Sequence, residues 1–174
     1  PFLAFSQRDL VAKTAQIISF RIESRNPGID NQTLLLPLSQ ELNQLFRFAD
    51  VAMAENITIQ WKGESPFNKF KKLSKKELQL TSANNNLALL KIEIEHRYNP
   101  VLGGIISRSR RHVMKLRIAL FTSTGKRVWY HKRKDSCCIN LGVDEEDEFL
   151  FRDMDAASFV ELYDSVLRKT FGKQ

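Results

Sequence analysis

The sequence has little of what most readily identifies a protein's function. Its 174 residues include only two cysteines, Cys137 and Cys138, which are adjacent. Neighbouring cysteines rarely bond to each other, so we expect two small residues near the end of a strand, with a vicinal disulfide or a metal role as the alternative. No apolar run reaches the roughly 18 residues that span a bilayer, so we expect no transmembrane segment.

Motifs for catalysis, cofactors and metals are also missing. Gly103-Gly104 lacks the Gly-Lys-Ser/Thr of a phosphate-binding loop, and no Gly-x-Ser-x-Gly nucleophile elbow occurs. Asp144–Glu148 lacks the residue order of a calcium loop, and the three histidines lie on different predicted strands without metal-ligand spacing. We therefore expect no catalytic residue, no cofactor, no metal and no enzymatic activity. The alternative, an enzyme with a site scattered over the sheet, requires a deep pocket with convergent titratable groups.

Three consecutive predicted strands, Leu87–Tyr98, His112–Thr122 and Lys126–Lys134, organise the chain. Apolar and charged residues alternate in the first two: Leu90, Ile92 and Ile94 against Lys91, Glu93 and Glu95, then Met114, Leu116, Ile118 and Leu120 against Lys115 and Arg117. Successive side chains of a strand point to opposite faces of the sheet. We therefore expect the apolar sets to be buried and the charged sets to lie in water.

The sequence also predicts how these strands are connected. Gly125 supplies the positive φ of a tight turn, and Val128 and Tyr130 alternate with Arg127 and Trp129 in the strand that follows. Val101–Arg111 is expected to be an extended hairpin loop. We expect Cys137–Gly142 to extend the third strand.

The remaining elements flank this meander. We expect a strand in which Ile18, Phe20 and Ile22 share a face, and a second strand at Asn56–Trp61. Helices are predicted at Pro37–Phe48, with the proline in the first turn, at about Lys75–Ser82 after a Ser74–Glu77 capping box, and at Asp155–Phe171. The fold class is α+β: one mainly antiparallel sheet in the order β-α-β-(α)-β-β-β-α, with the Pro37–Phe48 and Asp155–Phe171 helices on one face.

The first seven residues differ from the rest. Short apolar residues that end in Ala-x-Ser resemble the tail of a secretory signal peptide cleaved after Ser6. The alternatives are a truncated chain or an apolar arm that packs on the core. We expect residues 8–174 to form a single α+β domain.

The charge of +7 is unevenly distributed. Eleven Lys and Arg residues and no acidic residue lie between Arg97 and Lys134, whereas Asp144–Asp155 carries seven acids against one Arg152. The candidate partner-binding residues are Arg108, Arg110, Arg111, Lys132, Arg133 and Lys134. The structural alternative is that the basic and acidic stretches neutralise each other. A nucleic-acid or phosphate-binding module that uses the basic 97–134 region is the other alternative, although interleaved aromatics and a recognition helix are missing.

A family resemblance predicts the cellular compartment of the protein. In Lys115–Trp129 (KLRIALFTSTGKRVW), a hydrophobic strand leads through Thr124-Gly125-Lys126 to a strand ending in Val128-Trp129, and the amphipathic segment Asp155–Phe171 follows. This order resembles small bacterial periplasmic and outer-membrane-associated accessory domains, such as those of the curli-secretion lipoprotein and of penicillin-binding-protein activators. The chain departs from them in having no lipobox cysteine. The resemblance implies a non-enzymatic, periplasmic or secreted envelope protein, associated with the outer membrane, that binds envelope protein partners.

Overall fold

The computed structural model describes residues 12–55, 57–61, 70–79, 86–102, 108–141 and 154–172. Within these ranges, the side chains of residues 78, 99–102, 108–111 and 138–141 are not described. The predicted N-terminal remnant or arm (residues 1–7), Gly103-Gly104 and Asp144–Glu148 lie outside the described residues.

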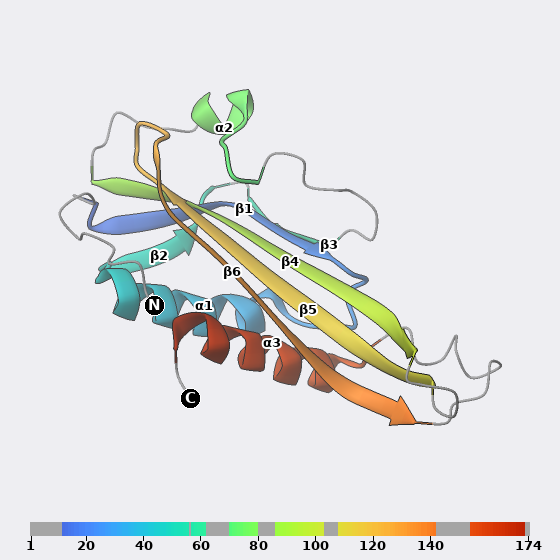
Figure 1. Cartoon of the computed structure of the whole chain (residues 1–174). Helices are drawn as coiled ribbons and strands as arrows, with labels where there is room; N and C mark the ends of the chain where they lie inside the picture. Colours follow the sequence, from blue (N-terminus) through green and yellow to red (C-terminus); the bar gives the residue numbers. More distant parts are fainter. Residues whose placement is uncertain are drawn as a thin grey trace.

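The described strands form one sheet, and the elements follow one another in an α+β order (Figure 1). They are β1 (Thr14–Glu23), α1 (Asn31–Phe46), β2 (Asp50–Met53), β3 (Ile59–Trp61), α2 (Lys75–Gln79), β4 (Leu87–Leu102), β5 (Arg108–Phe121), β6 (Arg127–Leu141) and α3 (Ala156–Phe171). The strand order is β2-β1-β4-β5-β6, with β3 also beside β1. The α+β fold is confirmed.

The sheet is also mixed, a feature that the sequence did not indicate. β4, β5 and β6 form the predicted antiparallel meander, but β1 runs parallel to β2, β3 and β4. The helical crossover through α1 explains the parallel β1–β2 pair, because a helix returns the chain to the end where the first strand began. The short strand β2 was not predicted from the sequence.

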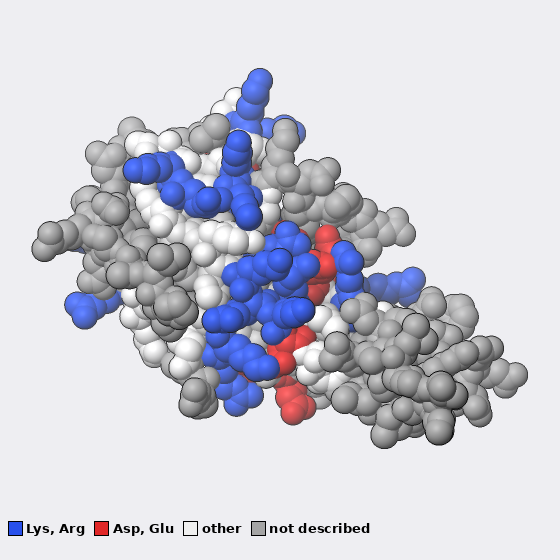
Figure 2. Space-filling view, viewed as in Figure 1, with Lys and Arg blue, Asp and Glu red and all other residues white. Residues whose placement is uncertain are grey.

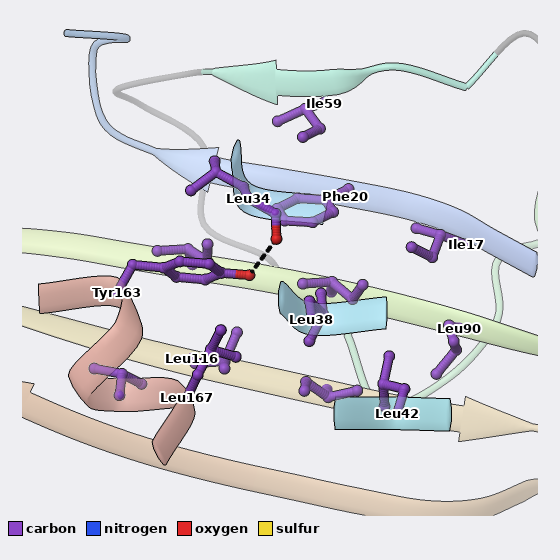
Figure 3. Close-up of a cluster of buried hydrophobic side chains, with 14 of the residues drawn as sticks. Ile17, Phe20, Leu34, Leu38, Leu42, Ile59, Leu90, Leu116, Tyr163 and Leu167 are labelled. Atoms are coloured by element: carbon purple, nitrogen blue, oxygen red, sulfur yellow. Dashed lines mark hydrogen bonds between the residues drawn. The ribbon is translucent and has the colours of Figure 1, made fainter. Parts of the chain in front are cut away.

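Helices α1 and α3 lie side by side on one face of the sheet, as expected, whereas α2 lies on the opposite side (Figure 1). Between the two long helices and the sheet is the main hydrophobic core. Leu34, Leu38 and Leu42 of α1 meet side chains of β1, β4 and β5 there (Figure 3). The fully buried Tyr163 of α3 donates a hydrogen bond of 2.9 Å to the Leu34 carbonyl and joins the two helices.

Helix α1 begins six residues before its proline, so the predicted start at Pro37 is wrong. Asp30 is the N-cap, and its side chain accepts a hydrogen bond from the backbone N–H of Gln32. The buried stripe therefore includes Leu34, one turn before Leu38. Pro37 lies inside the helix, where it cannot donate to the carbonyl four residues earlier.

Two β-bulges change which side chains face the helices. In β1, Ile17 pairs with Leu90 but Ser19 pairs with Lys91, so Ile18 is an extra residue. Ile18 consequently packs on the outer face, in a second cluster with Phe70 and Leu89. The prediction that it shares a face with Phe20 and Ile22 is wrong, because a bulge breaks the period of two.

The second bulge is in β6, where Leu120 pairs with Trp129 and Phe121 pairs with Arg127, so Val128 is extra. Trp129 therefore faces the helices and makes an edge contact with Phe46, with ring centroids 5.1 Å apart. Tyr130 instead lies on the outer face. This corrects the expected grouping of Val128 with Tyr130.

The hairpins are longer than the sequence indicated. The tight turn at Gly125 is confirmed, with φ of 84° and a backbone hydrogen bond to Thr122. β6 continues to Leu141, which bears out the expected extension as far as that residue. Residues 108–111 belong to β5, so the predicted loop at Val101–Arg111 is shorter than expected.

Leu116 provides the test of the core assignment. Its side chain is 1% exposed between β5 and the helices, so Leu116→Ala should lower the free energy of unfolding by about 2–5 kcal/mol. Leu36→Ala is the matched control, because Leu36 of α1 is 60% exposed and its truncation should change stability by less than about 0.5 kcal/mol. Equal denaturation midpoints for the two variants would contradict the strand register.

Candidate functional site: the charged outer face of the sheet

The face of the sheet opposite α1 and α3 carries ordered rows of charge. The strand register aligns Arg21, Glu93, Arg117 and Lys132 in one row, and Glu23, Glu95, Lys115 and Lys134 in the next. Opposite charges in directly facing positions of neighbouring strands stabilise a sheet. In Figure 2, Lys and Arg atoms form a band across the middle of the molecule with Asp and Glu atoms beside it.

Ion pairs in these rows neutralise the charges of β4 and β5. Glu95 accepts a hydrogen bond of 2.9 Å from Arg117, forms an ion pair with Lys115, and lies 2.5 Å from the Nε of Arg97. Arg117 also lies 3.4 Å from Glu93. The long side chains of β5 thereby cover the acids of β4.

This cover overturns one expectation from the sequence. Lys91, Glu93 and Glu95 were expected to lie in water, but they are 7%, 1% and 5% exposed. Alternation assigned these residues to the correct face of the sheet. It could not show that this face is covered by paired charges and by residues 70–79.

The two glutamates of β4 have pKa values shifted in opposite directions. Burial raises the pKa of Glu93 to about 7, against the attraction of Arg117. Burial also acts to raise the pKa of Glu95, but hydrogen bonds from Lys115 and Arg117 outweigh it and hold that pKa below its usual value. Glu95 is therefore held ionised, whereas Glu93 is an acid whose ionised form the fold disfavours.

Glu93→Gln should reveal this difference. The folded-state pKa of Glu93 lies above its ordinary 4.5, so the folded protein binds more protons than the unfolded chain between pH 4.5 and about 7. The contribution of Glu93 to stability therefore falls as the pH rises through that window. At pH 8 the variant should be more stable than the wild type by about 1–3 kcal/mol, measured by chemical denaturation across pH.

Glu95→Gln, two residues along the same strand, is the control of opposite sign. Its carboxylate has a lowered folded-state pKa and contributes stability above the unfolded value that is lost as the pH falls. This variant should lose stability at neutral pH. If Glu93→Gln lost as much stability at pH 8 as Glu95→Gln, the assignment of Glu93 would be contradicted.

The structure separates the candidate partner-binding residues into two sets. Lys132, Arg133 and Lys134 are exposed on β6, opposite Arg117, Leu116 and Lys115 of β5. Arg108, Arg110 and Arg111 lie on β5 rather than in a loop, and their side chains are not described. Arg111 is four residues from Lys115, which faces Lys134, so the nearest members of the two sets lie roughly 13 Å apart along the sheet at about 3.3 Å per residue.

The structure brings together a second basic cluster that was not predicted from the sequence. The Lys71 Nζ lies 5.0 Å from the centroid of the Tyr130 ring, and the Arg127 guanidinium carbon lies 5.7 Å from it. Arg127 also donates a hydrogen bond of 3.3 Å to the Lys71 carbonyl. We name this cluster the Tyr130 patch and define it by its exposed cations: Lys71, Lys72, Lys75, Lys76, Lys126 and Arg127.

Packing of residues 70–79 onto the outer face creates the patch. Phe70 and Leu73 join the second hydrophobic cluster, and Lys91 pairs with Glu77 at 3.0 Å. The predicted capping box is confirmed, because Ser74 and Glu77 each bond the other's backbone N–H. The sequence shows the basic residues around this box but not that they meet β6.

Two histidines that are far apart in the sequence meet on the helix side of the sheet. His96 Nε2 and His112 Nδ1 are 2.9 Å apart, and the Ser24 hydroxyl lies 3.1 Å from His96 Nδ1. The β4–β5 register brings them together. The described residues contain no group of three or more side chains suited to holding a metal. His131 lies apart from them, stacked on Trp129, and burial lowers its pKa.

A groove of about 670 Å³ lies on the helix side, between the start of α1 and the outward surface of α3. Its apolar lining includes Ile29 and Val160, and its polar lining includes Asp30, Asp164 and Arg168. Burial raises the pKa of Asp164. Asp30 is already engaged as the N-cap of α1.

Cys137 is disulfide-bonded. This contradicts the expectation of two unbonded cysteines near a strand end and agrees with the alternative that was left open. Cys137 lies opposite His112 and within β6, which continues to Leu141. Among the described helices, none combines the length and the apolar character needed to cross a bilayer.

Comparison with known protein families and with curated proteins finds no match for this chain. Solved structures with a similar course include a PelC dodecamer from Paraburkholderia phytofirmans, with 12% identity over 91% of this chain and 86% of that chain and a TM-score of 0.44. The hypothetical protein CT253 from Chlamydia trachomatis has 11% identity over 91% of this chain and 92% of that chain, with a TM-score of 0.43. Lipoprotein GNA1162 from Neisseria meningitidis has 12% identity over 90% of this chain and 96% of that chain, with a TM-score of 0.37. These similarities are weak, and we draw no functional conclusion from them.

Proposed function

We propose that this chain is a non-enzymatic accessory protein of the bacterial cell envelope, periplasmic or secreted and associated with the outer membrane. It acts by binding a protein partner along β6. The observation that carries the proposal is the unpaired charge of Lys132, Arg133 and Lys134 on the terminal strand, beside two cations of β5 that are paired with Glu95.

β6 is 15 residues long and is the last strand of the sheet, and no described strand pairs with its outer edge. Lys132, Arg133 and Lys134 are exposed, and none forms an ion pair with another residue that the structure describes. The neighbouring cations Lys115 and Arg117 are both paired with Glu95. Lys132 and Lys134 therefore provide unpaired positive charge beside the paired cations of β5.

An open strand edge offers backbone hydrogen bonds to an added strand, and positive charges on the edge oppose indiscriminate pairing. The same charges attract an acidic segment. The geometry accordingly favours a partner that presents an acidic strand or an acidic surface to β6.

The disulfide at Cys137 supports the proposed compartment. Stable disulfides form and persist in the bacterial periplasm and outside the cell, and they are rare in the cytosol. An exported protein fits this chemistry better than a cytosolic one.

The compartment can be tested on the native protein. Cells should be quenched with a thiol-alkylating reagent under denaturing, non-reducing conditions, and the peptide containing Cys137 analysed by mass spectrometry. We expect Cys137 to be unmodified before reduction and alkylated after it. Alkylation of Cys137 without reduction would contradict an oxidising compartment.

Charge reversal on β6 tests the proposed function. Lys132→Glu, Arg133→Glu and Lys134→Glu should together abolish crosslinking to envelope proteins in native cells, because an acidic edge repels an acidic partner. A matched variant reverses three exposed cations elsewhere: Lys13→Glu, Arg25→Glu and Arg168→Glu. This control should retain the crosslinks.

Crosslinked partners should be identified by mass spectrometry together with the N-terminus of the protein itself. Envelope partners that are lost only in the β6 variant would support the proposal. Recovery with ribosomes or nucleic acid, or equal loss in both variants, would contradict it and favour the nucleic-acid alternative.

A further inference from the structure

Two exposed cations converge on one aromatic ring in the Tyr130 patch. Lys71 and Arg127 lie within 6 Å of the Tyr130 ring centroid, and the hydrogen bond from Arg127 to the Lys71 carbonyl holds their two segments together. Among the described residues, no carboxylate pairs with either cation. An anion bound beside these two cations would be stabilised by the positive charge of both.

Four further cations extend this positive surface. Lys72, Lys75 and Lys76 are exposed along residues 70–79, and Lys126 is exposed in the turn before β6. Glu77 is the one acidic residue of this segment, and it is already bound to Lys91 and to the Ser74 backbone. The patch therefore carries six positive charges that no described acid neutralises.

Apolar contacts and hydrogen bonds attach the patch to the outer face of the sheet. Phe70 packs against the outer face beside Ile18 and Leu89, and its ring lies 6.2 Å from the Tyr130 ring. Lys91 donates a hydrogen bond of 3.1 Å to the Lys72 carbonyl. The cations consequently stand on a segment that lies across the sheet, and Figure 2 shows basic side chains gathered near α2 as well as over the strands.

The chemistry of the patch favours a lipid surface over a nucleic acid. Five of its six cations are lysines, which act as point charges and do not form the planar fork of arginine. The Tyr130 ring is flanked by two cations and by Phe70, so it is not a free platform for stacking a base. α2 has five residues and is too short to serve as a recognition helix.

We propose that the Tyr130 patch binds the phosphate headgroups of an anionic lipid bilayer. Clusters of four to eight Lys and Arg residues attract anionic membranes, and each contributes about 1 kcal/mol, or roughly fivefold in affinity. The binding is peripheral and electrostatic. It goes beyond the proposed protein contact, because it uses residues other than Lys132–Lys134.

Vesicle binding tests this proposal. The wild-type protein should co-float with phosphatidylcholine vesicles that contain roughly 30% phosphatidylglycerol, should not co-float with pure phosphatidylcholine vesicles, and should be released by salt. Lys71→Gln with Arg127→Gln should weaken binding about 30-fold, since two cations are removed. Arg25→Gln with Arg168→Gln removes two exposed cations outside the patch and should leave the affinity within about twofold.

A second pair of substitutions distinguishes loss of charge from a local structural change around Tyr130. Lys75 and Lys76 are exposed on α2, and Lys75→Gln with Lys76→Gln should weaken vesicle binding by a similar factor. Equal binding to both kinds of vesicle would overturn the proposal, as would equal affinities for the patch variants and the control. Tighter binding to duplex DNA than to the anionic vesicles at the same salt would also overturn it. The β6 crosslinks, tested separately, should survive in both patch variants.

Discussion

The register between β4 and β5 is the constraint on which the rest of the structure depends. It places Ile92 opposite Ile118 beneath the helices and, on the other face, sets Glu93 opposite Arg117 and Glu95 opposite Lys115. A slip of one residue would turn the apolar side chains out and the acids in. The same pairing brings His112 beside His96 and aligns β6, through β5, with the charged rows. One register therefore determines both the core and the outer surface.

The outer face divides into a neutralised centre and uncompensated margins. Burial under Arg117 and Lys115 makes the glutamates of β4 part of the folded framework. The cations that lack such partners lie on β6 and in the Tyr130 patch. Paired charges hold strands together, whereas exposed unpaired charges attract partners at a distance. This division is why we propose binding at the margins of the face, where the two sets of cations can be tested independently.

Period-two alternation was sufficient to predict the apolar face of β4 and β5, and together with the helical periodicity of the flanking segments it predicted the α+β fold class, because both patterns are local. It failed at Ile18 and Val128, where a bulge inserts one residue without a local signal. The start of α1 was also predicted wrongly, because Pro37 was interpreted as a first-turn proline. The N-cap is Asp30. The candidate cations of β6 were found from charge density alone. The Tyr130 patch and the burial of Glu93 were not found, since both require residues 70–79 and β5 to pack over β4.

We propose that Lys115 and Arg117 of β5 have a structural role, whereas the side chains of Lys132 and Lys134 of β6 are free. Double-mutant cycles on the free energy of unfolding test it most directly, with Glu95 paired first to Arg117 and then to Lys134. The account predicts a coupling of about 1 kcal/mol or more for Glu95 with Arg117, whose atoms lie 2.9 Å apart, and a coupling near zero for Glu95 with Lys134. Equal couplings in the two cycles would show that β6 belongs to the same ion network, and would contradict the assignment of β6 as a binding edge.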